Sequence, residues 1–149
     1  IIDCSVAPAD QPGAAKDFFE AVAELRRTCP SASFIGGPGN LSLPFRGVNP
    51  LREAVHSVFL YHAVPMGLNL AFVDPGRLPP FNEIEEKTRR LCDEVVRDQS
   101  ADGDHWPRLE SYAAYLLGSA ALEEAAAATV AYDLPPPCGG KGADVRHPP

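Results

Sequence analysis

The sequence predicts an α/β fold built on a parallel sheet. Three short apolar runs alternate with segments whose apolar residues repeat at helical spacing, and a last helical segment follows them. Strands and helices that alternate in this way form parallel sheets with right-handed crossovers. The expected elements are strand 1–6, helix 14–28, strand 33–37, helix 49–64, strand 68–73, a helix opened by residues 82–85 and a helix from residue 107.

The first half of the chain supports two strands around one helix. IIDCSV is a short apolar run, and the Pro- and Gly-containing loop APADQPG follows it. Phe18, Val22 and Leu25 then fall at i, i+4 and i+7, on one face of an amphipathic helix. Pro30 ends that helix because proline has no N–H to donate, and SFIGG gives the second strand.

The second helix has clear signals at both ends. Asn49 is a favoured N-cap and Pro50 a favoured first helical residue. Apolar residues repeat from there, and Pro65 ends the pattern. The next run, LNLAFV, is short enough to be a strand buried on both faces. Asn82 and Glu85 then form a capping-box pattern at the start of the third helix.

The composition changes near residue 118. We expect residues 1–118 to form one folded part and residues 119–149 to be separate from it. The separate part starts with the Ala-rich end of a helix and continues into the Pro- and Gly-rich run YDLPPPCGGKGADVRHPP, which has almost nothing to bury. We therefore predict a disordered tail.

Charge and hydropathy exclude several function classes. The formal net charge of the 149-residue chain is -7, and its Lys and Arg residues are scattered, so a nucleic-acid partner is not expected. No apolar run approaches the ~20 residues that span a bilayer, and no leader pattern is present, so we expect no membrane partner and a cytoplasmic location. The chain begins inside the apolar pair Ile1-Ile2, so we interpret it as a fragment. Three strands leave two sheet edges exposed, which also favours missing sequence or a partner.

The cysteines and histidines do not form a metal-ligand pattern. The four cysteines are widely spaced without a C-x-x-C pair, which favours free thiols in a reducing compartment. His56 and His62 share one helix but lie six residues apart, on opposite faces. We interpret them as ordinary helix residues and expect no metal.

One long stretch carries a family pattern. GGPGNLSLPFRGVNPLREAVHSVFLYHAVPMGLNLAFVDPGRL, which starts at Gly36, resembles the pterin-binding module of the cobalamin-dependent methionine synthases. Members of that family show a Gly-Gly-x-Ser-Asn-x-Ser-Phe-x-Phe-Arg-Gly loop and then an Arg-Glu-Ala-x-His helix. A strand that ends near Val-Asn-Ala-Gly follows. The resemblance extends more loosely from Ile1 to about Leu117.

This resemblance implies both a fold and an activity. The fold would be a partial TIM (β/α)₈ barrel, with this chain supplying the last three βα units, a C-terminal helix and a disordered tail. The missing N-terminal half of the barrel would be a partner. The activity would be that of a methyltransferase, which passes the methyl group of 5-methyltetrahydrofolate to cobalamin and on to homocysteine. Cobalamin would be carried by another module or by a corrinoid protein, zinc would be absent from this part, and the fragment would not be active alone.

The resemblance also implies the site residues. Asn40 matches the family Asn that contacts the pterin near N5, which makes it the expected catalytic residue. N5 is a poor leaving group that needs a hydrogen bond in the transition state, and an amide can donate or accept without a charge. Glycines let the backbone approach a flat ring, a Ser offers a hydroxyl, and an Arg holds a carboxylate or pterin carbonyl, or pairs with a helix start. The expected pterin-binding residues are Gly36, Gly37, Gly39, Asn40, Ser42, Arg46, Asp74 and Asp3.

The chain departs from the family pattern at several positions. Gly39 stands where the family has Ser, Pro38 and Pro44 stiffen the loop, and Asp74 stands where the family has Asn. The loop after the first strand is also shorter. These departures favour an alternative, a non-catalytic remnant or interaction module. A third possibility, a dihydropteroate synthase, is less favoured because its loop relies on a pair of basic residues, whereas the distinctive group here is Asn40.

Overall fold

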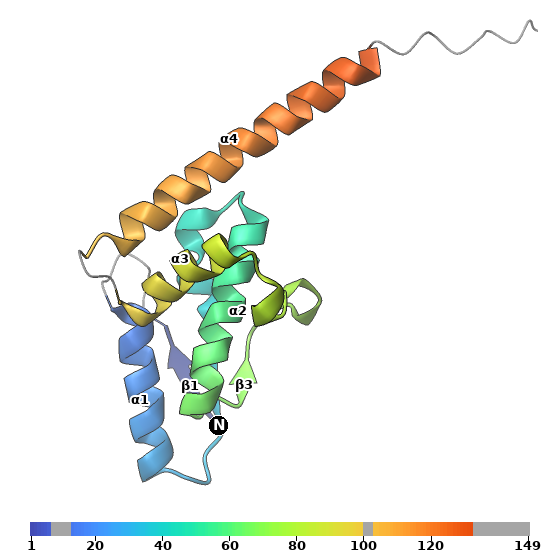
Figure 1. Ribbon diagram of the computed structural model, residues 1–149. Helices are drawn as coiled ribbons and strands as arrows, with labels where there is room; N and C mark the ends of the chain where they lie inside the picture. Colours follow the sequence, from blue (N-terminus) through green and yellow to red (C-terminus); the bar gives the residue numbers. More distant parts are fainter. Residues whose placement is uncertain (7–12, 100–102, 133–149) are drawn as a thin grey trace, which may run out of the picture. The chain divides into compact units, whose positions relative to one another are not determined.

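Three short strands and four α-helices follow one another along the chain (Figure 1). The computed structural model describes residues 1–6, 13–99 and 103–132. Its contacts divide the chain into two units, Ile1–Leu117 and Gly118–Pro149. The elements are β1 (Ile2–Ser5), α1 (Ala14–Thr28), β2 (Phe34–Gly37), α2 (Asn49–Met66), β3 (Leu70–Ala71), α3 (Glu86–Arg97) and α4 (His105–Tyr132).

The strands form one parallel sheet in the order β1-β2-β3. Ile2 pairs with Phe34, and Ile35 pairs with Leu70. Because side chains alternate between the faces of a strand, Ile2 and Phe34 share a face, and both pack into the core. Asp3 and Leu70 lie on the opposite face and are exposed. The core therefore lies against one face of the sheet.

The expectation of a partial (β/α)₈ barrel is wrong. The described structure is mostly helical (66%), and its three parallel strands are short. A barrel is filled by layers of side chains that the strands supply. Here the buried apolar residues come mainly from the helices, with Phe34 the buried strand residue. The third strand, expected at 68–73 and buried on both faces, has only two residues, and both are exposed.

The core packs α1 and α3 against the central helix α2. Phe59 of α2 lies between two aromatic rings of α1, with its ring centroid 5.2 Å from that of Phe18 and 5.3 Å from that of Phe19. Val55 and Val58 on the same helix are also fully buried. Such a cluster of large side chains dominates the hydrophobic stabilisation of a small domain.

The expected helix ends are right for the first helix and partly wrong for the next two. α1 spans Ala14–Thr28, as expected. Val48, and not Asn49, is the N-cap of α2, and α2 continues past Pro65 to Met66, where Gly67 caps it at a φ of 118°. Asn82 lies in a short 3₁₀ helix, and Glu85 is the N-cap of α3 instead. Its carboxylate accepts from the N–H groups of Lys87 and Thr88, so a residue expected at the third helical position occupies the cap itself.

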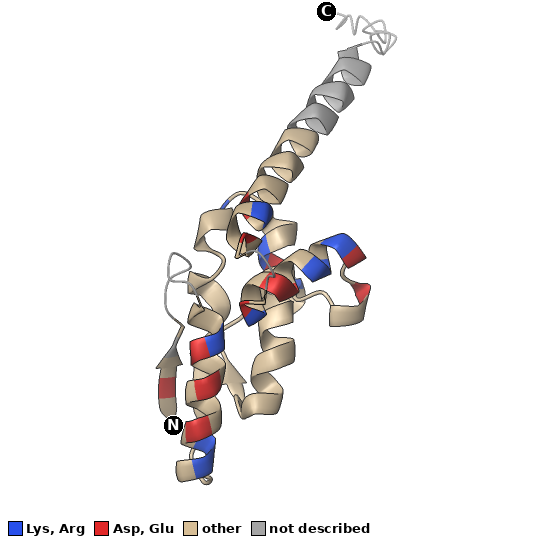
Figure 2. Ribbon diagram, turned by 60° about the vertical axis from the view of Figure 1, so that its left-hand side comes forward, with Lys and Arg blue, Asp and Glu red and all other residues tan. Residues whose placement is uncertain are grey.

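The last helix carries the Ala-rich sequence to Tyr132. The tail that we expected to be disordered lies in residues 133–149, outside the described residues. Cys138 also lies there, whereas Cys4, Cys29 and Cys92 are free thiols. Within the described residues, no helix has both the length and the apolar character needed to cross a membrane. Figure 2 shows acidic and basic residues interspersed along α1 and α3.

Candidate functional site

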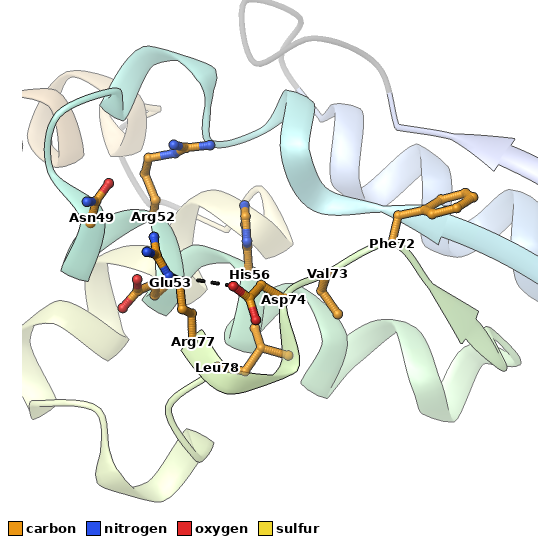
Figure 3. A pocket seen from close by; sticks show the side chains of 9 residues that line it. All are labelled: Asn49, Arg52, Glu53, His56, Phe72, Val73, Asp74, Arg77 and Leu78. Atoms are coloured by element: carbon orange, nitrogen blue, oxygen red, sulfur yellow. Dashed lines mark ion pairs between the residues drawn. The ribbon is translucent and has the colours of Figure 1, made fainter.

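A cavity of about 370 Å³, lined mostly by polar residues, opens between the first half of α2 and the loop after β3 (Figure 3). Ligands of parallel α/β sheets bind at the carboxyl ends of the strands, because loops from neighbouring strands meet there. The volume is within the range of about 300–1,000 Å³ that holds small molecules. The cavity is lined by Asn49, Arg52, Glu53, His56, Phe72, Val73, Asp74, Arg77 and Leu78.

The first half of α2 supplies one wall of this cavity. Asn49, Arg52, Glu53 and His56 fall at i, i+3, i+4 and i+7 and therefore share one helix face. The apolar residues of the same turns point into the core, where Val55 is fully buried. The core contact of α2 thus fixes which way its polar stripe faces.

The loop after β3 supplies the opposite wall. Asp74 is the N-cap of a short 3₁₀ helix, Pro75–Arg77, and its carboxylate accepts from the Gly76 N–H at 3.1 Å. The Arg77 guanidinium lies 3.6 Å from the second carboxylate oxygen, as the dashed line in Figure 3 shows. Phe72, 68% exposed, adds an apolar face. This wall therefore combines a carboxylate and a cation, whereas the Phe72 ring points away from them (Figure 3).

A buried serine holds the α2 wall in place. Ser42 is fully buried, and its Oγ lies 2.8 Å from His56 Nε2. Arg52 Nε donates to the same oxygen at 3.4 Å, and the hydroxyl itself reaches the Gly39 carbonyl at 3.1 Å. Burial lowers the pKa of His56, and the positive charge of Arg52 lowers it further. His56 is therefore neutral at neutral pH.

The cavity carries balanced charge. Arg52 and Arg77 provide donors, whereas Glu53 and Asp74 provide acceptors. The two positive and two negative groups offset each other, so the cavity has no strong preference for an anion or for a cation. The arrangement best suits a neutral or singly charged heterocycle whose edge alternates N–H and C=O groups.

Only one of the expected site residues lines the cavity, and that residue is Asp74. Ser42 lies behind the wall, where it bonds to His56. Asn40 is exposed at the end of β2, and its Nδ2 donates to the Val6 carbonyl at 2.8 Å. That bond ties the loop after β2 to the end of β1.

Two of the three expected ring-approach glycines have packing roles. A Cβ on Gly36 would lie 2.8 Å from Phe18 Cζ, so the missing side chain makes room for a core ring. A Cβ on Gly37 would lie 3.3 Å from Phe72 Cβ. Gly39 has no atom within 4 Å of its Cβ position, so it alone leaves open space.

The remaining expected residues lie away from the cavity lining. Arg46 is exposed after the 3₁₀ helix Leu43–Phe45, and Asp3 is exposed on β1. Arg52 and His56 line the cavity but were not expected as site residues. Their i, i+4 spacing was a usable signal, because it continues a polar stripe along a helix that is otherwise apolar.

The histidine gives a pH dependence that can be measured. Its pKa in the folded chain is below the value of about 6.5 expected when unfolded, so the unfolded state takes up the proton more readily. The contribution of neutral His56 to the free energy of unfolding is therefore complete above about pH 6.5 and is lost as the pH falls below that value. We expect the free energy of unfolding to decrease more between pH 7 and pH 5 in the native chain than in His56→Gln. Parallel profiles in urea titrations would contradict the expectation.

Neither a match to a known family nor a metal site identifies a function for the described residues. No protein-family model matches the chain. Within residues 1–6, 13–99 and 103–132, no group of three or more His, Cys, Asp or Glu side chains is arranged to hold a metal ion.

Proposed function

We propose that this chain is the folate-binding part of a methionine synthase-like methyltransferase that works in the cytoplasm. It would hold 5-methyltetrahydrofolate while the methyl group passes to a cobalamin and on to homocysteine. The proposal depends on the family resemblance of the stretch that starts at Gly36. The observation that carries it in the structure is the cavity between α2 and the loop after β3, because all nine residues that line it lie within this stretch.

The chemistry of the cavity fits a pterin ring. The pyrimidine edge of a pterin presents an amino group and a ring N–H side by side, and a carboxylate such as Asp74 accepts from two adjacent donors. The guanidinium of Arg77 can donate to the neighbouring carbonyl. Val73 and Leu78 add apolar side chains to the same lining.

By the family resemblance, Asn40 would supply the hydrogen bond that the methyl transfer needs, from the loop after β2 and outside the cavity lining. Its amide donates one hydrogen to the Val6 carbonyl, which fixes Nδ2 and Oδ1 in place. One N–H and the oxygen remain for a ligand. A held amide of this kind can strengthen its hydrogen bond to N5 as the carbon–nitrogen bond breaks.

Cobalamin would be carried by another module or by a corrinoid protein. A cavity of about 370 Å³ suits a pterin and is too small for a corrinoid ring with its side chains. The residues of this chain would therefore bind and orient the folate. The cobalamin chemistry and the homocysteine site would lie elsewhere, so the chain alone would bind without turnover.

Calorimetric titration of 5-methyltetrahydrofolate into the purified chain tests the proposal. We expect a Kd near 1 μM, or about 8 kcal/mol. Asn40→Ala should weaken binding about tenfold, or ~1.4 kcal/mol, because it removes one strong hydrogen bond. Asn40 and Asn82 are both exposed and lie outside the cavity lining, so Asn82→Ala is the matched control, because Asn82 lies in the 3₁₀ helix before α3 and outside the loop that resembles the family pattern. An absence of heat at millimolar folate would refute the proposal.

A second candidate is a non-catalytic remnant or interaction module. The contacts of Gly36 with Phe18 and of Asn40 with Val6 favour it, because each gives a family residue a structural reason to be present. In that case Asn40→Ala would lower the free energy of unfolding by about 1 kcal/mol, and the native chain would give no folate titration.

A further inference from the structure

We propose that His56 is a specificity-determining residue of the cavity, held by Ser42 as the neutral Nε2–H tautomer so that Nδ1 accepts a hydrogen bond from an N–H group of the ligand. The ligand class is a heterocyclic lactam, in which N–H and C=O groups are adjacent. Folate is one such lactam, so the inference deepens the proposed function. It rests on the proposed function only in naming folate as the ligand.

The hydrogen atoms around Ser42 can be counted. Its hydroxyl has one hydrogen to donate and two lone pairs with which to accept. Three groups lie within hydrogen-bond distance of Oγ: the Gly39 carbonyl at 3.1 Å, His56 Nε2 at 2.8 Å and Arg52 Nε at 3.4 Å. The carbonyl can only accept, and the guanidinium can only donate.

Only one arrangement satisfies all three contacts. The Ser42 hydroxyl donates to the Gly39 carbonyl and accepts from both Arg52 and His56, so Nε2 carries the imidazole hydrogen. If Ser42 donated to His56 instead, two oxygen lone pairs would face each other at 3.1 Å without a hydrogen between them. The Gly39 carbonyl would then keep its bond from the Ser42 N–H, at 3.3 Å, but the repulsion between the two oxygens disfavours this arrangement.

The second nitrogen of the ring is then the acceptor. Burial and the positive charge of Arg52 lower the pKa of His56, which keeps the ring neutral and Nδ1 free of a proton. Ser42 does not line the cavity, whereas His56 does. Since Nε2 points to Ser42, the part of the ring left for the cavity includes Nδ1. Figure 3 shows His56 on the wall it shares with Arg52.

The neighbours make this acceptor selective. Arg52 and Arg77 are donors at the same cavity, so a ligand carbonyl has partners there. A neutral Nδ1 beside them accepts a hydrogen bond from an N–H group of the ligand. A ligand with a second carbonyl at that position would find no donor for it there. Sites that bond a substrate N–H reject analogues that lack it, because the buried partner then stays unsatisfied.

Imidazole nitrogen NMR on the full chain tests the tautomer without any ligand. We expect His56 to show the Nε2–H pattern at pH 7.5, and Ser42→Ala to convert it to a mixture. The matched control is Ser57→Ala, because the buried Ser57 hydroxyl on α2 has no hydrogen-bond partner. An Nδ1–H or doubly protonated ring in the native chain would overturn the inference, whatever folate does.

A ligand series tests the acceptor role. We expect 5-methyltetrahydrofolate and uracil, but not 1,3-dimethyluracil, to shift the Nδ1 resonance. His56→Leu should weaken the binding of whichever lactam binds more than tenfold, and His56→Gln, which keeps an acceptor, should restore most of it. Dispersed backbone spectra would show that both variants are folded. If uracil shifts Nδ1 and folate does not bind, the proposed function fails and the inference stands. If neither lactam shifts Nδ1, or the dimethyl compound shifts it equally, the inference fails.

Discussion

Phe59→Ala should lower the free energy of unfolding by about 4 kcal/mol. The Phe59 side chain is fully buried and packs between Phe18 and Phe19, at centroid distances of 5.2 and 5.3 Å. Removing it leaves a cavity between α2 and the two rings of α1, and such rings relax only partly into the space. Urea titration monitored by circular dichroism measures the change, which is a large fraction of the stability of a small domain.

Phe72→Ala is the matched control for that experiment. The substitution is the same, but the Phe72 side chain is 68% exposed. We expect the free energy of unfolding to fall by no more than about 1 kcal/mol, because folding removes little apolar area from water at this position. Equal losses in the two variants would show that the core does not lie where α1 meets α2.

Gly36→Ala should lower the free energy of unfolding by about 2 kcal/mol. The added Cβ would lie 2.8 Å from Phe18 Cζ and 2.9 Å from the Cys4 carbonyl oxygen. The phenyl ring can shift, but the carbonyl belongs to the neighbouring strand and cannot. Overpacking of this kind costs about 1–3 kcal/mol, and the lower chain entropy of Ala offsets up to about 1 kcal/mol of it. Thermal and urea unfolding both report the result.

Gly39→Ala, three residues further along the chain, is the control. No atom of the described residues lies within 4 Å of the Gly39 Cβ position, so the substitution should change stability by no more than about 0.5 kcal/mol. Combining Gly36→Ala with Phe18→Leu separates the two clashes of Gly36. A double variant as unstable as the sum of the single variants would assign the cost to the Cys4 carbonyl. A native-like Gly36→Ala chain would show that the strand pairing is looser than the structure has it.

The helices were predictable from the sequence because each carries its own signals. The apolar repeat through Phe18 and Val22 set the bounds of α1, with Pro30 just beyond its end. The third strand was not predictable in the same way. An apolar run such as LNLAFV does not reveal how many of its residues find a partner, and only Leu70 and Ala71 pair. The barrel expectation failed for the same reason, because it depended on strands long enough to supply a core.

The site was predictable only where the loop sequence itself was distinctive. Asp74 and Ser42 were identified, and they lie in and behind the cavity wall. Arg52 and His56 were not, because polar residues on a helix usually face solvent. What gives them a role is the buried Ser42 hydroxyl beside them, a contact across fourteen residues of chain that no local pattern encodes.

The hydrogen bonds at the strand ends join segments that lie far apart along the chain, and this affects when they form during folding. Asn40 meets Val6 across 34 residues of chain, and the Phe34 N–H meets the Asn69 carboxamide across 35. Bringing such distant segments together costs loop-closure entropy before any contact offsets it, whereas the turns of α1 and α2 form locally. We therefore expect the strand ends, and the cavity beside them, to form after the helices, which provide the surface on which they assemble.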